Sequence, residues 1–466
     1  MSTPQQEIAR RIVHVSRHPT GESLRSARAI KRLDWVHLLG ICQDTPRADA
    51  AEVFTDLVRV EDVHDADQIV GAARMLSKRH GSLCQIVTAQ ETLLKPVAQA
   101  NDVLSLQGMS AATVLRALDK SSLKRILGQA GIRAARDRLI AGDADAIRFI
   151  DEVGYPIVLK PLTGSGGLAT WCIRNAEQLE LALRLMKPSP ENAVLAEDYL
   201  QGQELCIDTI TVDNEPRFHS LCCYRPSILE ALENPQVQWT CLMPRDFSGD
   251  RYSDFIRQGL AAVRALTVGN AMTHMEGFLL EDGGLSFTDA TLRPAGARIA
   301  PMLAFAYDID PYMAWARVVV DGCFDGPWER KYAVGTVFLR GTGYGLIEQV
   351  EGLEAVRRDA RELIVDARLP RVGATKSATY TGDGYITIRH CETRAVEETL
   401  QLIAQTVRIT YSHSESTARS NETLGEQWSQ KLGYFDEQLN RPAWDDDSLP
   451  GLPIVDFGMQ NADWEE

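Results

Sequence analysis

The chain has 466 residues, of which 44% are hydrophobic and 24% are charged. This length and composition are typical of a folded protein of about three domains, and they exclude an intrinsically disordered chain. The formal net charge is −15 and no dense run of lysine and arginine occurs. Nucleic acid and anionic membrane surfaces are therefore disfavoured as main partners.

The sequence carries no recognisable export or membrane signal. Its start lacks an apolar h-region, and no stretch of about 18 apolar residues occurs. The nine cysteines include no Cys-x-x-Cys pair, which fits reduced thiols better than a disulfide framework. We therefore expect a soluble, cytoplasmic protein without a membrane partner.

Residues 1–118 predict an N-terminal α/β domain. Short apolar runs alternate with helical patterns, which is the rhythm of an open parallel sheet. The expected strands lie in RRIVHVSR, WVHLLGIC, LVRVED and LCQIVTA. Because no Gly-x-Gly-x-x-Gly motif follows any of them, a dinucleotide site is not expected there.

Residues 119–204 predict a small lid and its linking helix. From Ala111 the pattern indicates one long amphipathic helix that ends at Gly131. Short strands are expected in RDRLIAG, YPIVLKPL, LATWCIRN and VLAEDYL. Residues 205–410 predict a larger β-rich domain, with strands in ELCIDTITVDN, GFLLEDGGLSFTDATL, YAVGTVFLR, YGLIEQVEG and GDGYITIRH. Residues 411–466 are polar and acidic and are expected to form an appended tail.

A lysine followed by a glycine-rich turn is the first chemical signal. Lys160 ends an apolar strand, and Gly164, Ser165, Gly166 and Gly167 follow it. Glycines let successive backbone N–H groups converge on phosphate oxygens, and the lysine adds a point charge. The Gly-Lys-Ser/Thr ending of a P-loop is missing, and a plain structural turn explains such a loop about as well.

Two acids flank a turn in VLAEDYLQGQEL. Glu197 and Glu204 lie on either side of Gly202, after an apolar strand. One carboxylate would suit the amino group of adenine and the other the hydroxyls of ribose, because each partner requires an acceptor. Taken alone, two solvated acids beside a turn are the commoner explanation.

A predicted hairpin carries the third signal. Glu276 lies near the end of one strand and Asp289 on the return strand, with an Asp-Gly-Gly turn between the strands and Arg293 just beyond. A hairpin brings such acids face to face, where hard oxygen ligands can hold Mg²⁺. Arg293 offers a guanidinium fork for a carboxylate or acyl phosphate, although an exposed salt-bridge cluster is an equal alternative.

Together with Lys120, these residues in this order resemble the ATP-grasp superfamily over about Asp119 to Pro301. The resemblance implies an α/β (α+β) fold in which a small lid and a larger β-sheet domain hold ATP. The implied nucleotide contacts are Lys120, Lys160, Gly164, Ser165, Gly166, Gly167, Glu197, Tyr199, Leu200 and Glu204. The implied ligands of Mg²⁺, or of Mn²⁺, are Glu276, Asp289 and Thr291.

Within the superfamily, His274-x-Glu276 and RPAGAR look most similar to the bacterial L-amino-acid ligases and related carboxylate–amine ligases. That resemblance implies that a carboxylate is activated as an acyl phosphate and passed to an amine, with ADP and phosphate released. It places Arg293 and Gly296 at the acyl phosphate, with Arg298 and His274 as weaker candidates. His274 reads equally well as a structural histidine, and a homodimer is ordinary for the resembled family.

The sequence departs from the family pattern at two positions and leaves alternatives open. Asp289 stands where glutamate is usual and Thr291 where asparagine is usual, so a non-catalytic nucleotide-binding protein is one alternative. A biotin-carboxylase-like or purine-pathway enzyme is another, although RPAGARIAPM lacks the acid and histidine of biotin carboxylases. Substrate selectivity is expected to come from Cys222–Arg245 and Tyr307–Trp315, whose apolar and aromatic residues suggest a partly hydrophobic substrate.

Overall fold

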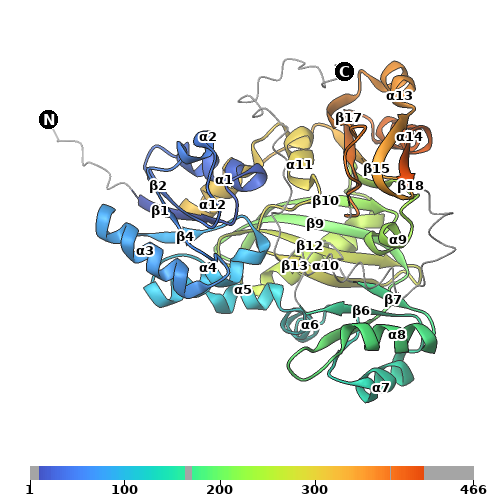
Figure 1. Cartoon of the computed structure of the whole chain (residues 1–466), viewed down its shortest axis with the longest axis horizontal. Coiled ribbons are helices and arrows are strands. Elements are labelled where there is room, and N and C mark those ends of the chain that lie inside the picture. The colour runs from blue at the N-terminus through green and yellow to red at the C-terminus, as the bar shows by residue number, and fades with distance from the viewer. Residues whose placement is uncertain (1–9, 163–169, 378, 414–466) are drawn as a thin grey trace.

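The structure is a computed structural model that describes residues 10–162, 170–377 and 379–413. The predicted loop of Gly164, Ser165, Gly166 and Gly167 lies outside these residues, as does nearly all of the expected tail. Four sheets organise the described chain (Figure 1). All nine cysteines are free thiols, in agreement with the prediction. Within the described ranges, no helix combines the length and the apolar character that a membrane crossing requires.

The N-terminal domain is a parallel sheet, as predicted. Its strand order is β3-β2-β1-β4, built from β1 (Arg10–Ser16), β2 (Val36–Cys42), β3 (Asp56–Arg59) and β4 (Gln85–Val87). Helices cover both faces of this sheet. Because successive side chains of a strand point to opposite faces, neighbouring residues belong to different hydrophobic cores. Ile12 packs with α1 (Gly21–Lys31), whereas Val13 packs with α3 (Ala66–His80) and α4 (Glu91–Leu104). The short helix α2 (Ala48–Ala51) completes this domain.

The expected single helix from Ala111 to Gly131 was wrong, because two helices occupy this stretch. They are α5 (Ala111–Leu118) and α6 (Lys120–Gln129), separated by Asp119 in an extended conformation. The Asp119 carboxylate accepts a hydrogen bond from the backbone N–H of Ser122 at 2.7 Å and so caps α6. Short acidic side chains compete in this way with continued helix, which ends one helix and starts the next. Lys120 thereby becomes the first residue of α6.

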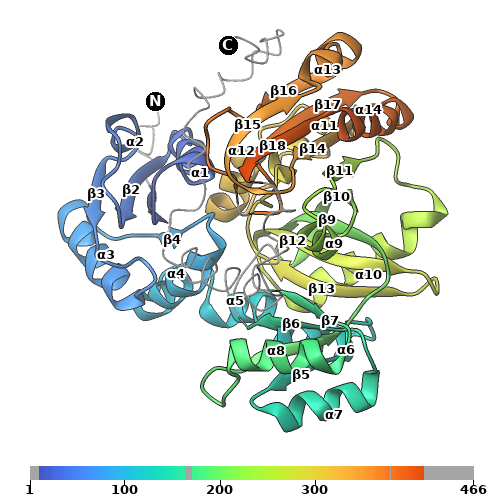
Figure 2. The same ribbon diagram turned by 45° about the vertical axis from the view of Figure 1, so that its right-hand side comes forward.

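The lid is a four-stranded antiparallel sheet of order β5-β8-β6-β7. The strands are β5 (Asp137–Ile140), β6 (Ile157–Pro161), β7 (Trp171–Ile173) and β8 (Val194–Asp198), as the sequence predicted. Helices α7 (Asp143–Val153) and α8 (Ala176–Met186) supply its small core. Figure 2 shows the lid next to β13, at the edge of the central sheet.

The central sheet has eight antiparallel strands in the order β13-β12-β9-β10-β11-β14-β17-β16. Their bounds are β9 (Gly202–Val212), β10 (Glu215–Arg225), β11 (Trp239–Met243), β12 (Ala271–Leu280), β13 (Leu285–Thr291), β14 (Ala333–Leu339), β16 (Ile364–Arg368) and β17 (Gly384–His390). Of these strands, β10, β11 and β16 were not predicted from the sequence.

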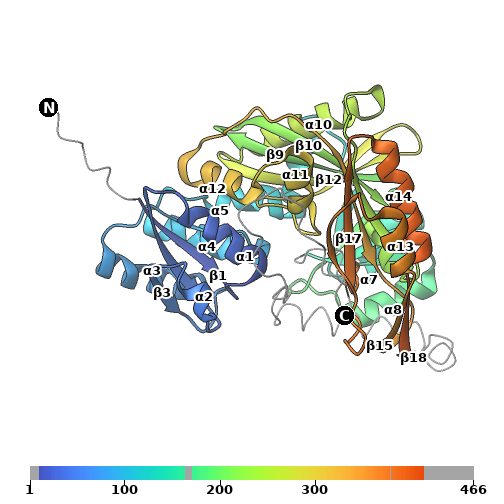
Figure 3. The ribbon, with the colours of Figure 1, turned by 90° about the horizontal axis from the view of Figure 1, so that it is seen from above.

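Helices cover both faces of this sheet (Figure 3). Ile207 of β9 packs into the core with α10 (Asp250–Leu266), whereas Ile210 enters the core of α11 (Ile299–Tyr307) and α12 (Pro311–Asp321). The remaining elements are α9 (Ile228–Glu233), α13 (Leu353–Ala360), α14 (Thr393–Thr406) and the ribbon of β15 (Tyr344–Glu351) with β18 (Arg408–His413). Because α12 also packs against α1, the N-terminal domain adjoins the central sheet.

Candidate functional site

A cavity of about 1010 Å³ lies where the N-terminal domain, the lid and the central sheet meet. All sequence-predicted site residues that the structure describes line it, except one. The lining residues from that prediction are Lys120, Lys160, Glu197, Tyr199, Leu200, Glu204, His274, Glu276, Asp289, Thr291, Arg293 and Gly296. The exception is Arg298. The N-terminal domain adds Arg17, Glu91 and Lys95 to the wall.

Two lysines converge on Asp289 inside the cavity. Lys120, at the start of α6, forms an ion pair with Asp289, and Lys160 Nζ lies 3.5 Å from Asp289 Oδ2. Burial alone would raise the pKa of Asp289, but the two ammonium groups outweigh it and hold that pKa well below its usual value. Asp289 therefore stays ionised. Its side chain keeps 34% of its surface exposed, so a cation in the cavity can reach it.

A third lysine, which was not predicted from the sequence, completes this cluster. Lys124 Nζ donates to Glu197 Oε1 at 2.5 Å, and Lys160 Nζ lies 2.6 Å from Glu197 Oε2. Glu197 was expected to offer its carboxylate to adenine. In this structure lysines contact both carboxylate oxygens, so neither oxygen is left for adenine. The available signal was spacing: Lys124 follows Lys120 by one helical turn, on the same face of α6.

Glu204 is buried on β9 and has an unusual protonation equilibrium. Its Oε2 accepts a hydrogen bond from the backbone N–H of Ile228 at 2.6 Å. Burial, and next the nearby charge of Glu276, raise the pKa of Glu204 to about 8. At neutral pH this group is largely protonated, so it can both donate to and accept from a hydroxyl.

The predicted face-to-face acids of the hairpin are confirmed. Glu276 on β12 pairs directly with Asp289 on β13, and a register shift follows Glu276. At this irregularity, a Cβ added to Gly277 would lie 2.8 Å from the carbonyl oxygen of Ser286. Glycine therefore permits the close strand approach beside Glu276.

Thr291 ends the same strand with an unsatisfied hydroxyl. Its Oγ1 is buried and has no hydrogen-bond partner among the described residues. A buried hydroxyl without a partner is costly, which suits a position that a ligand satisfies. Carboxylates and hydroxyls are hard oxygen donors, so Glu276, Asp289 and Thr291 fit Mg²⁺ or Mn²⁺ by their chemistry.

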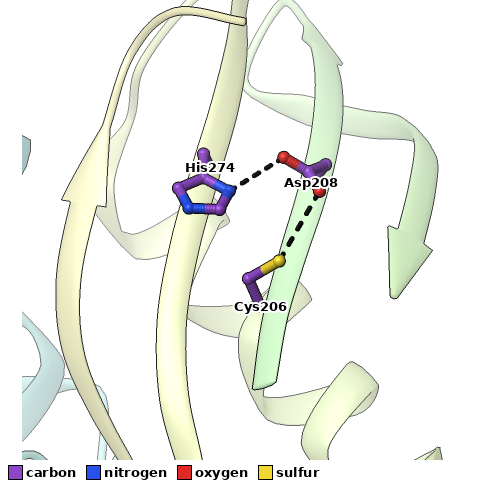
Figure 4. A group of neighbouring side chains, drawn as sticks. All are labelled: Cys206, Asp208 and His274. Atoms are coloured by element: carbon purple, nitrogen blue, oxygen red, sulfur yellow. Dashed lines mark hydrogen bonds and ion pairs between the residues drawn. The ribbon is translucent and has the colours of Figure 1, made fainter. Parts of the chain in front are cut away.

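His274 lies between two acids, as Figure 4 shows for one of them. Its Nδ1 is 2.9 Å from Asp208 Oδ1, and its Nε2 is 3.3 Å from Glu276 Oε1. Burial lowers the pKa of His274, but Asp208 outweighs burial and the pKa lies well above its usual value. The hydroxyl of Tyr224 approaches the same Glu276 oxygen at 3.4 Å. Asp208 was not predicted, and Tyr224 was predicted only as part of the range Cys222–Arg245, which was expected to set substrate selectivity.

Arg293 faces the cavity from the loop after β13. Its Nη2 donates to Glu91 Oε2 at 2.7 Å and its Nη1 to the carbonyl oxygen of Pro294 at 2.7 Å. A Cβ added to Gly296 would lie 3.7 Å from Nη1, so the glycine packs beside the guanidinium. Glu91 belongs to the N-terminal domain, 202 residues away in sequence, and no local pattern pointed to it.

Two expectations about the pocket were wrong. Arg298 has a left-handed backbone (φ 64°) that starts α11, and its guanidinium pairs with Asp366 and lies 4.1 Å over the Tyr385 ring. These partners hold it in a second ion pair and not in the cavity wall. Tyr307 and Trp315 are likewise core residues.

Two other tyrosines, Tyr224 and Tyr380, provide aromatic lining in their place. Tyr224 is the last residue but one of β10, inside the expected selectivity range, and Tyr380 lies in the connection between β16 and β17. Both rings pack edge-on against Trp239, at centroid distances of 5.2 and 4.9 Å. An aromatic wall of this kind suits a partly apolar ligand.

Comparison with protein families supports the sequence resemblance. Residues 117–215 match the family model of the RimK-like ATP-grasp domain. The alanine–anticapsin ligase of Bacillus subtilis is 21% identical over 251 residues, which cover 48% of this chain. They cover 51% of that ligase, so the matched part spans about half the length of the curated relative.

Solved structures match over most of the chain. The L-amino acid ligase from Bacillus licheniformis aligns with a TM-score of 0.70 at 17% identity, covering 87% of this chain and 99% of that one. The biotin carboxylase domain of 2-oxoglutarate carboxylase from Hydrogenobacter thermophilus, a dimer in complex with MgADP and bicarbonate, aligns with a TM-score of 0.60 at 16% identity. That alignment covers 86% of this chain and 90% of the domain. The predicted fold class is thereby confirmed.

Proposed function

We propose that this chain, which has the ATP-grasp fold, is an ADP-forming ligase that joins a small-molecule carboxylate to an amine. The observation that carries the proposal is the convergence of Lys120 and Lys160 on Asp289, opposite Glu276. Cations for phosphate oxygens and acids for a divalent metal thus meet in one cavity. Both sets of charges are what phosphoryl transfer from ATP needs.

The lysine cluster would hold the phosphates of ATP. The side chains of Lys120 and Lys160 are each 11% exposed, and in a site of low dielectric their attraction for phosphate exceeds its value in water. Tyr199 and Leu200, which follow β8, would form the wall for the base, and Glu204 would face the ribose. A Glu204 that is protonated at neutral pH can donate to one ribose oxygen while it accepts from the other.

Glu276, Asp289 and Thr291 would hold Mg²⁺, which neutralises charge on the phosphate oxygens when bound. The substrate carboxylate attacks the γ-phosphorus, the bond to ADP breaks, and an acyl phosphate forms. The amine then attacks the acyl carbon, inorganic phosphate leaves, and the amine loses a proton. Arg293, whose planar fork suits two oxygens, would bind the acyl phosphate beside Gly296.

Similarity to ligases of amino acids supports a substrate pair in which at least one partner is an amino acid. The L-amino acid ligase from B. licheniformis aligns over nearly its whole length. Tyr224 and Tyr380 add aromatic surface to a cavity whose walls also carry charged side chains, such as Lys120, Lys160 and Arg293. An amino acid with an apolar side chain presents both kinds of surface.

The test is release of ADP and phosphate from ATP and Mg²⁺ in the presence of pairwise mixtures of the twenty amino acids, with product masses recorded. We expect a condensed product from at least one mixture, and Arg293→Ala abolishes it. Arg257→Ala is the matched control, because that arginine is 68% exposed and forms a local ion pair with Asp254 at 2.8 Å. A single arm with bicarbonate tests the carboxylase-like alternative. Nucleotide binding without turnover in every arm would contradict a ligase of these substrates.

A further inference from the structure

We propose that Asp208 and His274 are a positioning pair for Glu276, holding its carboxylate so that one oxygen is fixed by hydrogen bonds and the other is left for a divalent cation. This inference rests on the proposed function only in taking Glu276 as a metal ligand. Nothing in the sequence pattern had given Asp208 a role. Its role follows from what the central sheet brings together.

The three side chains share one face of the sheet. His274 on β12 is the direct cross-strand partner of Asp208 on β9, and Glu276 lies two residues further along β12. Residues two apart on a strand point to the same side, so the imidazole lies between the two acids. Its Nδ1 is 2.9 Å from Asp208 Oδ1 and its Nε2 is 3.3 Å from Glu276 Oε1.

Each ring nitrogen of His274 faces a carboxylate oxygen, and these two contacts on opposite sides of the ring fix its orientation. Asp208 is buried and His274 nearly so, with side chains 4% and 13% exposed, so water competes little for the bond between them. Tyr224 donates to the same Oε1 of Glu276, which concentrates the protein's hydrogen bonds on one oxygen.

Apart from its bond to His274, the Asp208 carboxylate makes only a weak contact among the described residues. Its other oxygen, Oδ2, faces the Cys206 thiol at 3.8 Å, and a thiol is a weak donor (Figure 4). A buried carboxylate without a strong partner is costly. The bond to His274 is therefore the interaction that offsets the cost of burying the Asp208 carboxylate. By holding the ring in place, this bond also positions Glu276.

The same three residues, Cys206, Asp208 and His274, offer ligand atoms within 4.8 Å of one another and so resemble a metal site of their own. The geometry favours a hydrogen bond. Two nitrogen or oxygen ligands at about 2.0 Å from a tetrahedral zinc lie about 3.3 Å apart, which exceeds the 2.9 Å between Nδ1 and Oδ1.

The test measures metal binding directly, without reference to turnover. Mn²⁺ binding to the full chain is followed by electron paramagnetic resonance with a non-hydrolysable ATP analogue present. We expect Asp208→Asn to raise the Mn²⁺ dissociation constant about 10- to 100-fold, as loss of an outer partner of a metal ligand does. Affinity for the analogue in EDTA, and the thermal unfolding midpoint, separate this effect from misfolding and are expected to stay close to wild type.

Two further variants sharpen the result. Cys206→Ser keeps a donor to Asp208 and is expected to leave Mn²⁺ binding unchanged. His274→Gln, whose amide nitrogen can reach Glu276, is expected to retain more Mn²⁺ affinity than the shorter His274→Asn. If His274 only stabilised the fold, the two variants would not be expected to differ in Mn²⁺ affinity in this order.

Several outcomes would overturn the inference. Wild-type Mn²⁺ affinity in a folded Asp208→Asn protein would do so, as would wild-type chain that binds the analogue but no Mn²⁺. Stoichiometric zinc in the purified chain that Cys206→Ser removes would assign these residues to a separate metal site. If the expected Mn²⁺ pattern appears while no amino acid mixture yields product, the positioning pair stands and the ligase proposal fails.

Discussion

Glu91 and Arg293 are joined by a charged hydrogen bond of 2.7 Å across the boundary between the N-terminal domain and the central sheet. Glu91 is the first residue of α4, and Arg293 follows the strand that carries Asp289. The N-terminal parallel sheet therefore has a direct connection to the hairpin of the candidate metal site. A substrate anion that binds Arg293 would compete with Glu91 for the same guanidinium.

This pair should stabilise the junction measurably. The side chains are 24% and 15% exposed, so their coupling lies between that of a surface pair and that of a fully buried one. We expect a double-mutant cycle with Glu91→Ala and Arg293→Ala to give a coupling of about 1–3 kcal/mol in the free energy of unfolding. Asp254 and Arg257, which form an exposed pair, provide the control cycle, with an expected coupling under about 1 kcal/mol. Equal coupling energies in the two cycles would show that the Glu91–Arg293 pair stabilises the fold no more than an exposed surface pair does.

Removal of Lys124 should unbalance the buried charge of Glu197. Both side chains are only 6% exposed, and Lys160 supplies the other contact to the same carboxylate. We expect Lys124→Met to lower the free energy of unfolding by about 2–4 kcal/mol, because one positive partner of a buried charge is lost. Adding Glu197→Gln to Lys124→Met should recover part of that loss in chemical denaturation. If Lys124 stabilises the chain by packing alone, the double variant will be no more stable than Lys124→Met.

Glu204 should make stability depend on pH between about 4.5 and 8. Its pKa in the folded chain is about 8, above the ordinary value of 4.5 for glutamic acid. The folded state therefore binds this proton more tightly than the unfolded state. The stability from that proton is complete below pH 4.5 and is lost as the pH rises through 8.

In Glu204→Gln the side chain stays neutral at every pH. We expect its unfolding midpoint, compared with wild type, to rise progressively from pH 5 to pH 8. The difference between the two proteins isolates Glu204 from other titrating groups. A constant difference across this range would mean that the carboxyl group titrates normally.

Lys160 should contribute strongly to nucleotide affinity. Its ammonium group is buried at the end of β6 and faces the cavity beside Lys120. A hydrogen bond to a charged group contributes about 1.5–3 kcal/mol, so Lys160→Met should weaken ATP binding by about 10- to 150-fold in calorimetry. Lys187, exposed at the end of α8, provides the control, and Lys187→Met should bind ATP as wild type does. Unchanged binding by a folded Lys160→Met protein would remove Lys160 from the nucleotide site.

The sequence by itself determined the elements whose patterns are local. The parallel strands of the N-terminal domain, the four lid strands and the β12–β13 hairpin all follow from apolar runs bounded by turn residues. The pairing of Glu276 with Asp289 was predictable because a short hairpin fixes its own register. Strands β10, β11 and β16 were not predicted, and their length is not the reason, because the shorter β5 and β7 were predicted while β10 has 11 residues. In β10 the pattern is interrupted near Pro216, where the pairing with β9 also shifts its register.

Contacts between distant segments were decided only by the tertiary structure. Glu91 meets Arg293, Lys124 meets Glu197, and Asp208 meets His274 because sheets and domains pack, and no spacing in the chain records these meetings. The break at Asp119 was also decided by competition, since an amphipathic pattern continued through it while its side chain capped the next helix. Hydrophobic periodicity can be read from the local sequence, whereas the partners of a buried charge depend on which elements the fold places around it.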